Sequence, residues 1–300
     1  MPTYPLYQVD AFTDQPLSGN PCAVVFDCAD LDDATMLAIA REMNLSETAF
    51  VWRTADGRFR ARYFTPAEEI PLAGHPTIAT LYALVDSGRL TLGGDYLKMP
   101  LELRDGPIEV EIFAAGGKVE RIVMSQRKPQ FLSTHRPSDV LPAFGLDEAD
   151  LLPGAVLQTV STGTPQIMIP LREHASLRKA VLDIEKYAAL RANSDFFSPH
   201  LFCLGGVERG ATFARHFGLP PDTPEDPFTG SATGGMAAYL WRYDLIESPR
   251  FLAEQGHWMG RPGRAYVEVI GPRDAIETVK VGGSAVTVLR GELTLSSPTS

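Results

Sequence analysis

The chain is poor in charge and in cysteine, and each shortage excludes a class of protein. Only 21% of its 300 residues are charged and 44% are hydrophobic, a balance that excludes an intrinsically disordered chain. The cysteines are Cys22, Cys28 and Cys203, an odd number without CxxC spacing, so neither a disulfide framework nor a zinc site is indicated. We expect a folded protein of a reducing compartment, the cytoplasm.

Basic residues and long apolar runs are also scarce. Lys and Arg number 27 against 37 Asp and Glu, which gives a formal net charge of −10 and no basic block. Nucleic acid and anionic membranes are therefore not expected as partners. The sequence shows neither a run of about 18 apolar residues nor a basic and then apolar leader at its start. We expect a soluble, unsecreted protein whose partner is a small molecule.

The motifs that bind common cofactors are missing as well. The sequence has no GxGxxG after a predicted strand, no Walker loop and no HExxH helix. Nucleotide and zinc mechanisms are therefore not indicated. The sequence predicts neither a metal nor an organic cofactor, so the chemistry must be carried by the protein's own side chains.

The chain is, however, rich in Gly (26 residues) and Pro (24 residues). Frequent Gly and Pro are typical of short strands joined by tight turns. Residues 30–43 predict an amphipathic surface helix, because apolar side chains recur at helical spacing behind an acidic first turn. Strands are predicted at 22–26, 59–63, 107–113, 119–124, 156–161, 166–169, 201–204 and 211–215.

The segment 126–142 is polar, contains proline and shows no periodicity, so we place a domain junction there. Two domains of about 150 residues are the usual outcome for a chain of this length. The sequence thus predicts domains at 1–127 and 128–300, with the last strand able to pack on the first domain.

Two further helices, beginning at Gly74 and Gly230, have almost no polar face and should be buried on all sides. Both follow similar turns, and an offset of 156 residues brings identical residue types together. This pattern suggests an internal repeat, although so few identities also arise by chance. The matched pairs are Pro71 with Pro227, Gly74 with Gly230, Thr77 with Thr233 and Leu84 with Leu240.

The starts of these two helices are candidate binding groups. Unpaired N–H groups and the positive end of the helix dipole would attract an anion such as a carboxylate. If both helices begin at a common cleft, Gly74 and Gly230 would bind the same substrate carboxylate. The alternative is that each glycine only permits close packing of a buried helix.

Three side chains near these helix starts are candidates for chemistry, and each also has a purely structural explanation. His75 would be kept neutral by the helix dipole and could exchange protons near pH 7, yet single histidines are often structural. A turn at 227–230 could bring Asp226 and Ser231 together, unless they are only a turn residue and a helix cap. Glu47 precedes an apolar strand, where a carboxyl group has a raised pKa and can act as general acid or base.

Five ordered blocks of the sequence closely resemble the PhzF-like family of phenazine-biosynthesis proteins, and together they cover nearly the whole chain. The blocks are GNPCAVV (19–25), NLSETAF (44–50), FTP with PLAGHPT (64–66 and 71–77), EDPFTGSA (225–232) and EQG with MGRP (254–256 and 259–262). The resemblance implies an α+β fold of the diaminopimelate epimerase type. In such a fold, two similar domains each wrap a β-barrel-like sheet around a central helix, with the active site in the cleft between them and a homodimer as the assembly.

The resemblance also implies a function and its residues. In the founding enzyme a glutamate shuttles a proton while a dihydro-hydroxyanthranilate is isomerised, helped by a histidine, an aspartate and a serine. By motif position these correspond to Glu47, His75, Asp226 and Ser231. The related epimerases carry a pair of cysteines where this chain has Ala73 and Thr229, so the resemblance does not extend to a two-thiol racemase.

A second departure changes the edge of the expected pocket. Many members of the family have Cys-Gly-His-Ala where this chain has Ala-Gly-His-Pro at 73–76, which leaves every proposed proton carrier in place. The identity of the substrate is what this departure puts in question.

The sequence therefore predicts a cofactor-free isomerase that moves a proton on a small carboxylate-bearing substrate. Glu47 would remove and return the proton, His75 and Asp226 would tune or relay it, and Gly74, Gly230 and Ser231 would bind the carboxylate. Two alternatives stay open: an amino-acid epimerase or racemase in which Asp226 supplies a second base, and a non-catalytic protein that only binds a small acid.

Overall fold

The computed structural model describes residues 1–295, and the chain divides into two compact units. The first unit comprises residues 1–124 together with the chain from Gly282 onward, and the second comprises residues 125–281. The sequence placed the junction between 127 and 128 and allowed the last strand to pack on the first domain. In the structure the last strand, β18, pairs with the first strand, β1. Among the described residues, no helix has the length and apolarity needed to cross a membrane.

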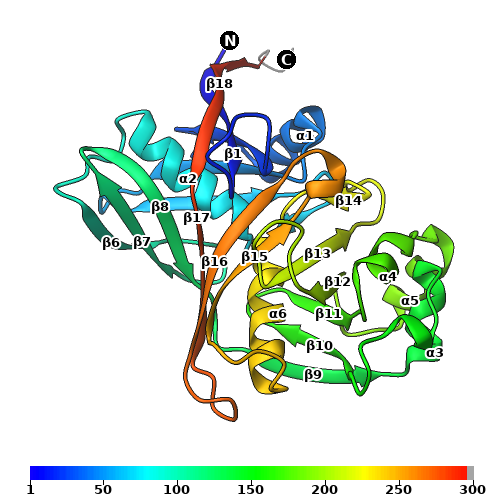
Figure 1. The fold of residues 1–300 in the computed structure, drawn as a ribbon. Helices are drawn as coiled ribbons and strands as arrows, with labels where there is room; N and C mark the ends of the chain where they lie inside the picture. The colour runs from blue at the N-terminus through cyan, green and yellow to red at the C-terminus, as the bar shows by residue number, and fades with distance from the viewer. Residues whose placement is uncertain (296–300) are drawn as a thin grey trace. The chain divides into compact units, whose positions relative to one another are not determined.

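The first unit is built on a six-stranded sheet with the order β18-β1-β2-β3-β4-β5, and β6, β7 and β8 follow one another in antiparallel pairs (Figure 1). Most pairs in the six-stranded sheet are antiparallel, but β2 and β3 run parallel. The strands are β1 (Thr3–Ala11), β2 (Asn20–Phe26), β3 (Glu47–Arg53), β4 (Phe59–Phe64), β5 (Glu69–Ile70), β6 (Tyr96–Leu101), β7 (Ile108–Ala115), β8 (Lys118–Ser125) and β18 (Ala285–Thr294).

Two helices serve this unit, and both were predicted. Helix α1 (Asp33–Met43) makes the crossover between the parallel strands β2 and β3, and the Asp32 carboxylate caps it by accepting the Thr35 N–H. Helix α2 (Gly74–Asp86) packs against β1, β2, β3 and β18. Every residue from Gly74 to Leu81 is buried, which confirms that this apolar helix is the centre of its unit.

The second unit has the same kind of core. Helix α6 (Gly230–Arg242) packs against β10, β11 and β16, and its residues are buried from Gly230 to Leu240 (Figure 1). The strands are β9 (Gln130–His135), β10 (Leu157–Ser161), β11 (Pro165–Pro170), β12 (Ser198–Leu204), β13 (Thr212–Phe217), β14 (Glu225–Asp226), β15 (Arg250–Gln255), β16 (Gly263–Ile270) and β17 (Thr278–Gly283). The other helices are α3 (Pro137–Val140), α4 (His174–Lys179), α5 (Ile184–Ala192) and the short 3₁₀ turns η1 (Leu141–Phe144), η2 (Glu148–Asp150) and η3 (His257–Met259).

The expectation that residues 126–142 lack regular structure is wrong, because this segment contains β9 and α3. Among the described residues, strand β9 pairs only with β10 at the edge of its sheet, and none of its side chains is fully buried. An exposed edge strand carries no alternation of apolar and polar residues, which is why the sequence pattern did not reveal it.

The internal repeat suggested by the sequence is confirmed by the strand pairing of the two units. In the first unit β1–β2 is antiparallel, β2–β3 parallel, and β3–β4 and β4–β5 antiparallel. The second unit repeats this series in β10–β11, β11–β12, β12–β13 and β13–β14. The offset of 156 residues that relates Gly74 to Gly230 also relates β5 to β14.

Individual side-chain contacts repeat as well. Arg62 binds Glu69 through two N–H···O contacts of 2.8 and 2.7 Å, and Arg215 binds Glu225 in the same way, at 2.8 Å for both. The hydroxyl of Thr77 donates to the carbonyl of residue 73, and the hydroxyl of Thr233 donates to that of residue 229. The same contacts therefore fix β5 and the first turn of α2 in the first unit, and β14 and the first turn of α6 in the second.

Candidate active site

The first group of candidate residues lies where β3 begins and α2 begins. Glu47 is the first residue of β3, and its Oε2 lies 3.2 Å from Nδ1 of His75, the second residue of α2. His75 is buried, whereas 17% of the Glu47 side chain is exposed. The structure thus brings together two residues that the sequence proposed separately, and leaves the carboxylate partly accessible to a small molecule.

Asn20 joins this pair, although the sequence did not single it out. Its Nδ2 lies 2.9 Å from the same Nδ1 of His75, and Asn20 is fully buried. An Nδ1 that donates to Glu47 cannot at the same time accept a proton from the Asn20 amide. The location of the imidazole proton therefore decides which contact is a hydrogen bond, as a group that relays protons requires. The available signal was the GNP block at 19–21.

The neighbouring side chains do not compete for this proton at neutral pH. Cys22 is paired with Glu47 across β2 and β3, and burial, with the Glu47 charge adding to it, raises the pKa of the Cys22 thiol well above its usual value. Burial also raises the pKa of Tyr63, whose hydroxyl is 3.0 Å from that of Thr77. Both groups therefore stay protonated at neutral pH.

The second group lies where β14 ends and α6 begins. Asp226 is the last residue of β14 and is almost fully buried. The hydroxyl of Thr229 donates to its Oδ2 at 2.5 Å, and the side-chain amide of Gln255 donates to its backbone carbonyl at 2.7 Å. The Asp226 carboxylate and backbone are therefore held in place by hydrogen bonds.

Ser231 is the second residue of α6, at the position that His75 occupies in α2. Its Oγ accepts a hydrogen bond of 3.2 Å from Gln166 Nε2, and no side-chain cap bond is formed at this helix start. The interpretation of Ser231 as only a helix cap is therefore wrong. Gln166 had no signal in the sequence.

Gly74 and Gly230 are the first residues of their helices, where backbone N–H groups have no partner within the helix. Gln126 Nε2 donates to the Gly230 carbonyl at 2.8 Å. It can reach this carbonyl because residue 234 is glycine, since a Cβ there would lie 1.8 Å from Gln126 Oε1. This part of α6 is therefore fixed from the side.

Two buried histidines, on β12 and β13, lie close to Asp226. His216 is paired with Asp226 across β13 and β14, and its Nδ1 is 3.3 Å from Nδ1 of His200. Burial lowers the pKa of His216 to about 4, although the Asp226 charge opposes the change, and burial lowers the pKa of His200 well below its usual value. Both imidazoles are neutral at pH 7.

The EQG block has a structural role next to this site. Burial acts to raise the pKa of Glu254, but the carboxylate accepts the N–H groups of Glu208, Arg209 and Gly210, and these hold the pKa below its usual range. His257 lies 3.9 Å from the same carboxylate. Glu254 thus anchors the loop between β12 and β13, while the adjacent Gln255 reaches Asp226.

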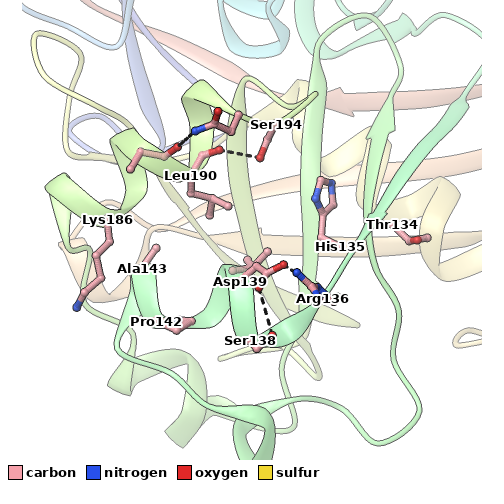
Figure 2. Close-up of a pocket in the computed structure, with 13 residues that line it drawn as sticks. Thr134, His135, Arg136, Ser138, Asp139, Pro142, Ala143, Lys186, Leu190 and Ser194 are labelled. Carbon is pink, nitrogen blue, oxygen red and sulfur yellow. Dashed lines mark hydrogen bonds and ion pairs between the residues drawn. The ribbon is translucent and has the colours of Figure 1, made fainter.

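A hollow of about 620 Å³ in the second unit lies between α3 and α5 (Figure 2). Arg136 and Ser138 both contact Asp139 at its rim, and His135 lines its wall. None of the site residues proposed from the sequence lines this hollow. It is therefore separate from the candidate active site.

Two repeated α+β units, each with a buried helix and polar groups at its first turn, form a fold that this chain shares with solved PhzF-family and epimerase structures. A solved PhzF-family protein of Bacillus anthracis matches with a TM-score of 0.84 and 29% identity over 98% of this chain and 100% of that one. A hydroxyproline epimerase of Agrobacterium vitis shares the fold, with a TM-score of 0.69 and 12% identity over 99% and 94% of the chains.

The chain belongs to the family of phenazine biosynthesis-like proteins, whose family model matches residues 9–291. A trans-2,3-dihydro-3-hydroxyanthranilate isomerase of Pseudomonas aeruginosa is 35% identical, over 94% of this chain and 96% of the relative. An uncharacterized isomerase of Clostridium acetobutylicum is 33% identical, over 98% and 99%. The predictions of the α+β fold, the family and an isomerase are confirmed, and the alternative of a non-catalytic binding protein is set aside.

Proposed function

We propose that this isomerase moves a proton from one carbon to another of a small carboxylate-bearing substrate, with Glu47 as the group that removes and returns it. The observation that supports this is the Glu47 carboxylate, partly accessible and 3.2 Å from the buried His75. A C–H bond breaks, the electron pair shifts along a conjugated system, and a new C–H bond forms. No oxidant or reductant is needed, and the proposed mechanism uses neither a metal nor an organic cofactor.

The remaining candidates bind the substrate and stabilise its charge. Backbone N–H groups at Gly74 and Gly230, with the hydroxyl of Ser231, bind the substrate carboxylate, because helix N-termini favour anions. His75 and Asp226 relay protons and balance the charge that develops on the substrate.

The cysteines favour this mechanism over a two-thiol epimerase. Cys22, Cys28 and Cys203 are all buried, and burial raises the pKa of each thiol, to about 12 for Cys28 and Cys203. A thiol acts as a base only as its thiolate, which these environments disfavour. A carboxylate base is therefore the better assignment.

The substrate class follows from the relatives. The Pseudomonas aeruginosa relative is named for an anthranilate, which is a small ring acid bearing a carboxylate and an amine. We propose trans-2,3-dihydro-3-hydroxyanthranilate or another small unsaturated acid as the substrate. A homodimer and a cytoplasmic location stay predictions.

Incubation of the protein with this acid and with a panel of small carboxylic and amino acids in heavy water tests the proposal. Proton and deuterium NMR should show one deuteron entering the true substrate or product, with a shifted double bond. Exchange with inversion of a chiral amino acid, and no isomer, would instead identify an epimerase. No exchange on any member of the panel contradicts the proposed substrate class.

A further inference from the structure

Three side chains of the second unit that can bind a metal ion lie close together, and none of them is a site residue proposed from the sequence. They are Glu208 in the loop between β12 and β13, Glu254 on β15 and His257, the first residue of η3. One ligand atom from each lies within 4.8 Å of the other two. Spacing along the chain does not reveal this group, because Glu208 and Glu254 are 46 residues apart.

His257 is the residue that points to a ligand. Only 7% of its side chain is exposed, and among the described residues neither of its ring nitrogens has a hydrogen-bond partner. The ring of Phe213 packs edge to face against the imidazole, at 5.5 Å between centroids, and fixes its plane. Nε2 then faces two carboxylates, at 3.5 Å from Glu208 Oε1 and 3.9 Å from Glu254 Oε2. A cation between the three groups would satisfy this buried nitrogen.

The Glu254 carboxylate is held in place by backbone groups. It is fully buried and accepts the N–H groups of residues 208–210, two of them at Oε1 and one at Oε2. Oε2, the oxygen that faces His257, therefore keeps a lone pair for a further partner. The loop comes this close because residue 206 is glycine, since a Cβ there would lie 2.5 Å from Oε2.

Glu208 opens the group to solvent. Its side chain is 46% exposed, and its Oε2 contacts Arg264, which leaves Oε1 toward His257. Two carboxylates against one guanidinium, with a neutral imidazole, give these groups a net negative charge. Both the charge and the exposed side favour the entry of a cation.

We propose that Glu208, Glu254 and His257 bind a divalent transition-metal cation, Zn²⁺, which joins the loop between β12 and β13 to η3. A tetrahedral Zn²⁺ with bonds of about 2.0–2.2 Å holds its ligand atoms about 3.4 Å apart. The distances of 3.5 and 3.9 Å from His257 Nε2 are close to this value. A water molecule on the exposed side completes the tetrahedron.

The donor set selects the kind of ion. One imidazole nitrogen with two carboxylate oxygens is a combination that suits Zn²⁺, whereas Mg²⁺ and Ca²⁺ take oxygen ligands. The cation has a structural role, and the proposed proton transfer does not use it. The proposal therefore goes beyond the proposed function and is tested without a substrate.

The test measures Zn²⁺ binding to the full chain after treatment with a chelator and dialysis. Calorimetry and elemental analysis should show one Zn²⁺ per chain that His257→Gln and Glu208→Gln each lose. Each substitution should weaken the affinity by at least about 10²-fold, since loss of a ligand costs more than loss of a group that only orients one. Zn²⁺ should also raise the Tm of the wild type and not that of Glu208→Gln.

Two histidine variants are the controls and should bind Zn²⁺ like the wild type. His174→Gln removes an imidazole that packs on the same Phe213 ring but contacts the Gly205 carbonyl. His75→Gln removes an imidazole of the candidate active site. Circular dichroism checks the folding of each variant, and Glu208→Gln, at an exposed position, carries the test if His257→Gln does not fold.

Three results would overturn the proposal. A wild type that binds no Zn²⁺ would show that the three side chains form only an ion-paired group. Wild-type affinity in Glu208→Gln would place the ion elsewhere on the chain. Loss of the ion in His75→Gln, with binding kept in Glu208→Gln, would assign it to the candidate active site.

Discussion

The two units have the same arrangement of strands around a central helix, but they differ in the second residue of that helix. The ion pairs of Arg62 with Glu69 and of Arg215 with Glu225 are alike, and so are the first turns of α2 and α6. At the second residue of the helix, however, the first unit has His75 and the second has Ser231. The comparison indicates that the repeated contacts maintain the fold, while the positions that differ are the ones proposed to carry the chemistry.

The largest expected effect is that of a substitution at His75, which should lower the rate of the chemical step. His75→Gln should lower kcat by about 10²–10⁴-fold, because the imidazole that contacts Glu47 can no longer exchange protons. Steady-state kinetics measure this, with circular dichroism as the check on folding. A kcat within a few-fold of the wild type would remove His75 from the proposed proton pathway.

The second largest expected effect is a difference between the two units in their sensitivity to acid. Burial lowers the pKa of His216 to about 4, so the unfolded chain binds more protons than the folded protein between about pH 6.5 and pH 4. The free energy of unfolding should therefore fall as the pH falls through this range, by up to about 3 kcal/mol for this residue. His200, whose pKa is also lowered, adds to the effect.

Urea unfolding at a series of pH values measures this slope. The matched variant is His216→Phe, which keeps an aromatic ring and removes the titrating group. Tyr63, the corresponding residue of the first unit, does not titrate in this range because burial raises its pKa. A His216→Phe protein with the same pH dependence as the wild type would show that another group is responsible.

Ser231→Ala should act mainly on binding, in contrast to His75→Gln. Removal of the hydroxyl that is proposed to contact the substrate carboxylate should weaken binding by about 1–3 kcal/mol. Calorimetry with a substrate analogue gives the affinity, and kcat measured at saturation should change far less. An unaltered affinity would mean that the backbone N–H groups of the helix starts bind the carboxylate without Ser231.

The smallest effects concern the repeated ion pairs. Arg62→Leu and Arg215→Leu should each lower the free energy of unfolding by about 1–2 kcal/mol, since both side chains are partly buried. Arg215→Leu should be the more damaging, because Arg215 also donates to the carbonyls of Leu177 and Ala180, whereas the further partner of Arg62 is the exposed carboxylate of Asp33. Denaturant midpoints compare the two, and the reverse order would contradict this account of the repeat.

The sequence revealed those parts of the fold that have a local pattern. The apolar helices at Gly74 and Gly230 and the helix at 30–43 were predicted because periodicity and capping residues act within a few positions. Strand β9 and helices α4 and α5 were not predicted, since β9 is an exposed edge strand and the helices are short or weakly amphipathic.

The same limit applies to the candidate site. Glu47 was proposed from its place before an apolar strand and His75 from its place at a helix start, and only the fold shows that they lie 3.2 Å apart. Gln166 contacts Ser231 from a strand 65 residues away along the chain. Because a lone Gln is chemically ordinary, no pattern in a single sequence distinguishes it from a surface residue.

The measurement that tests the central claim most directly is solvent deuterium exchange on the substrate by Glu47→Gln. The amide keeps the shape of the side chain but cannot accept and return a proton. Exchange should fall by at least about 10²-fold while calorimetry shows that a substrate analogue still binds. Glu47→Gln with near-normal exchange would contradict the assignment of Glu47 as the proton carrier.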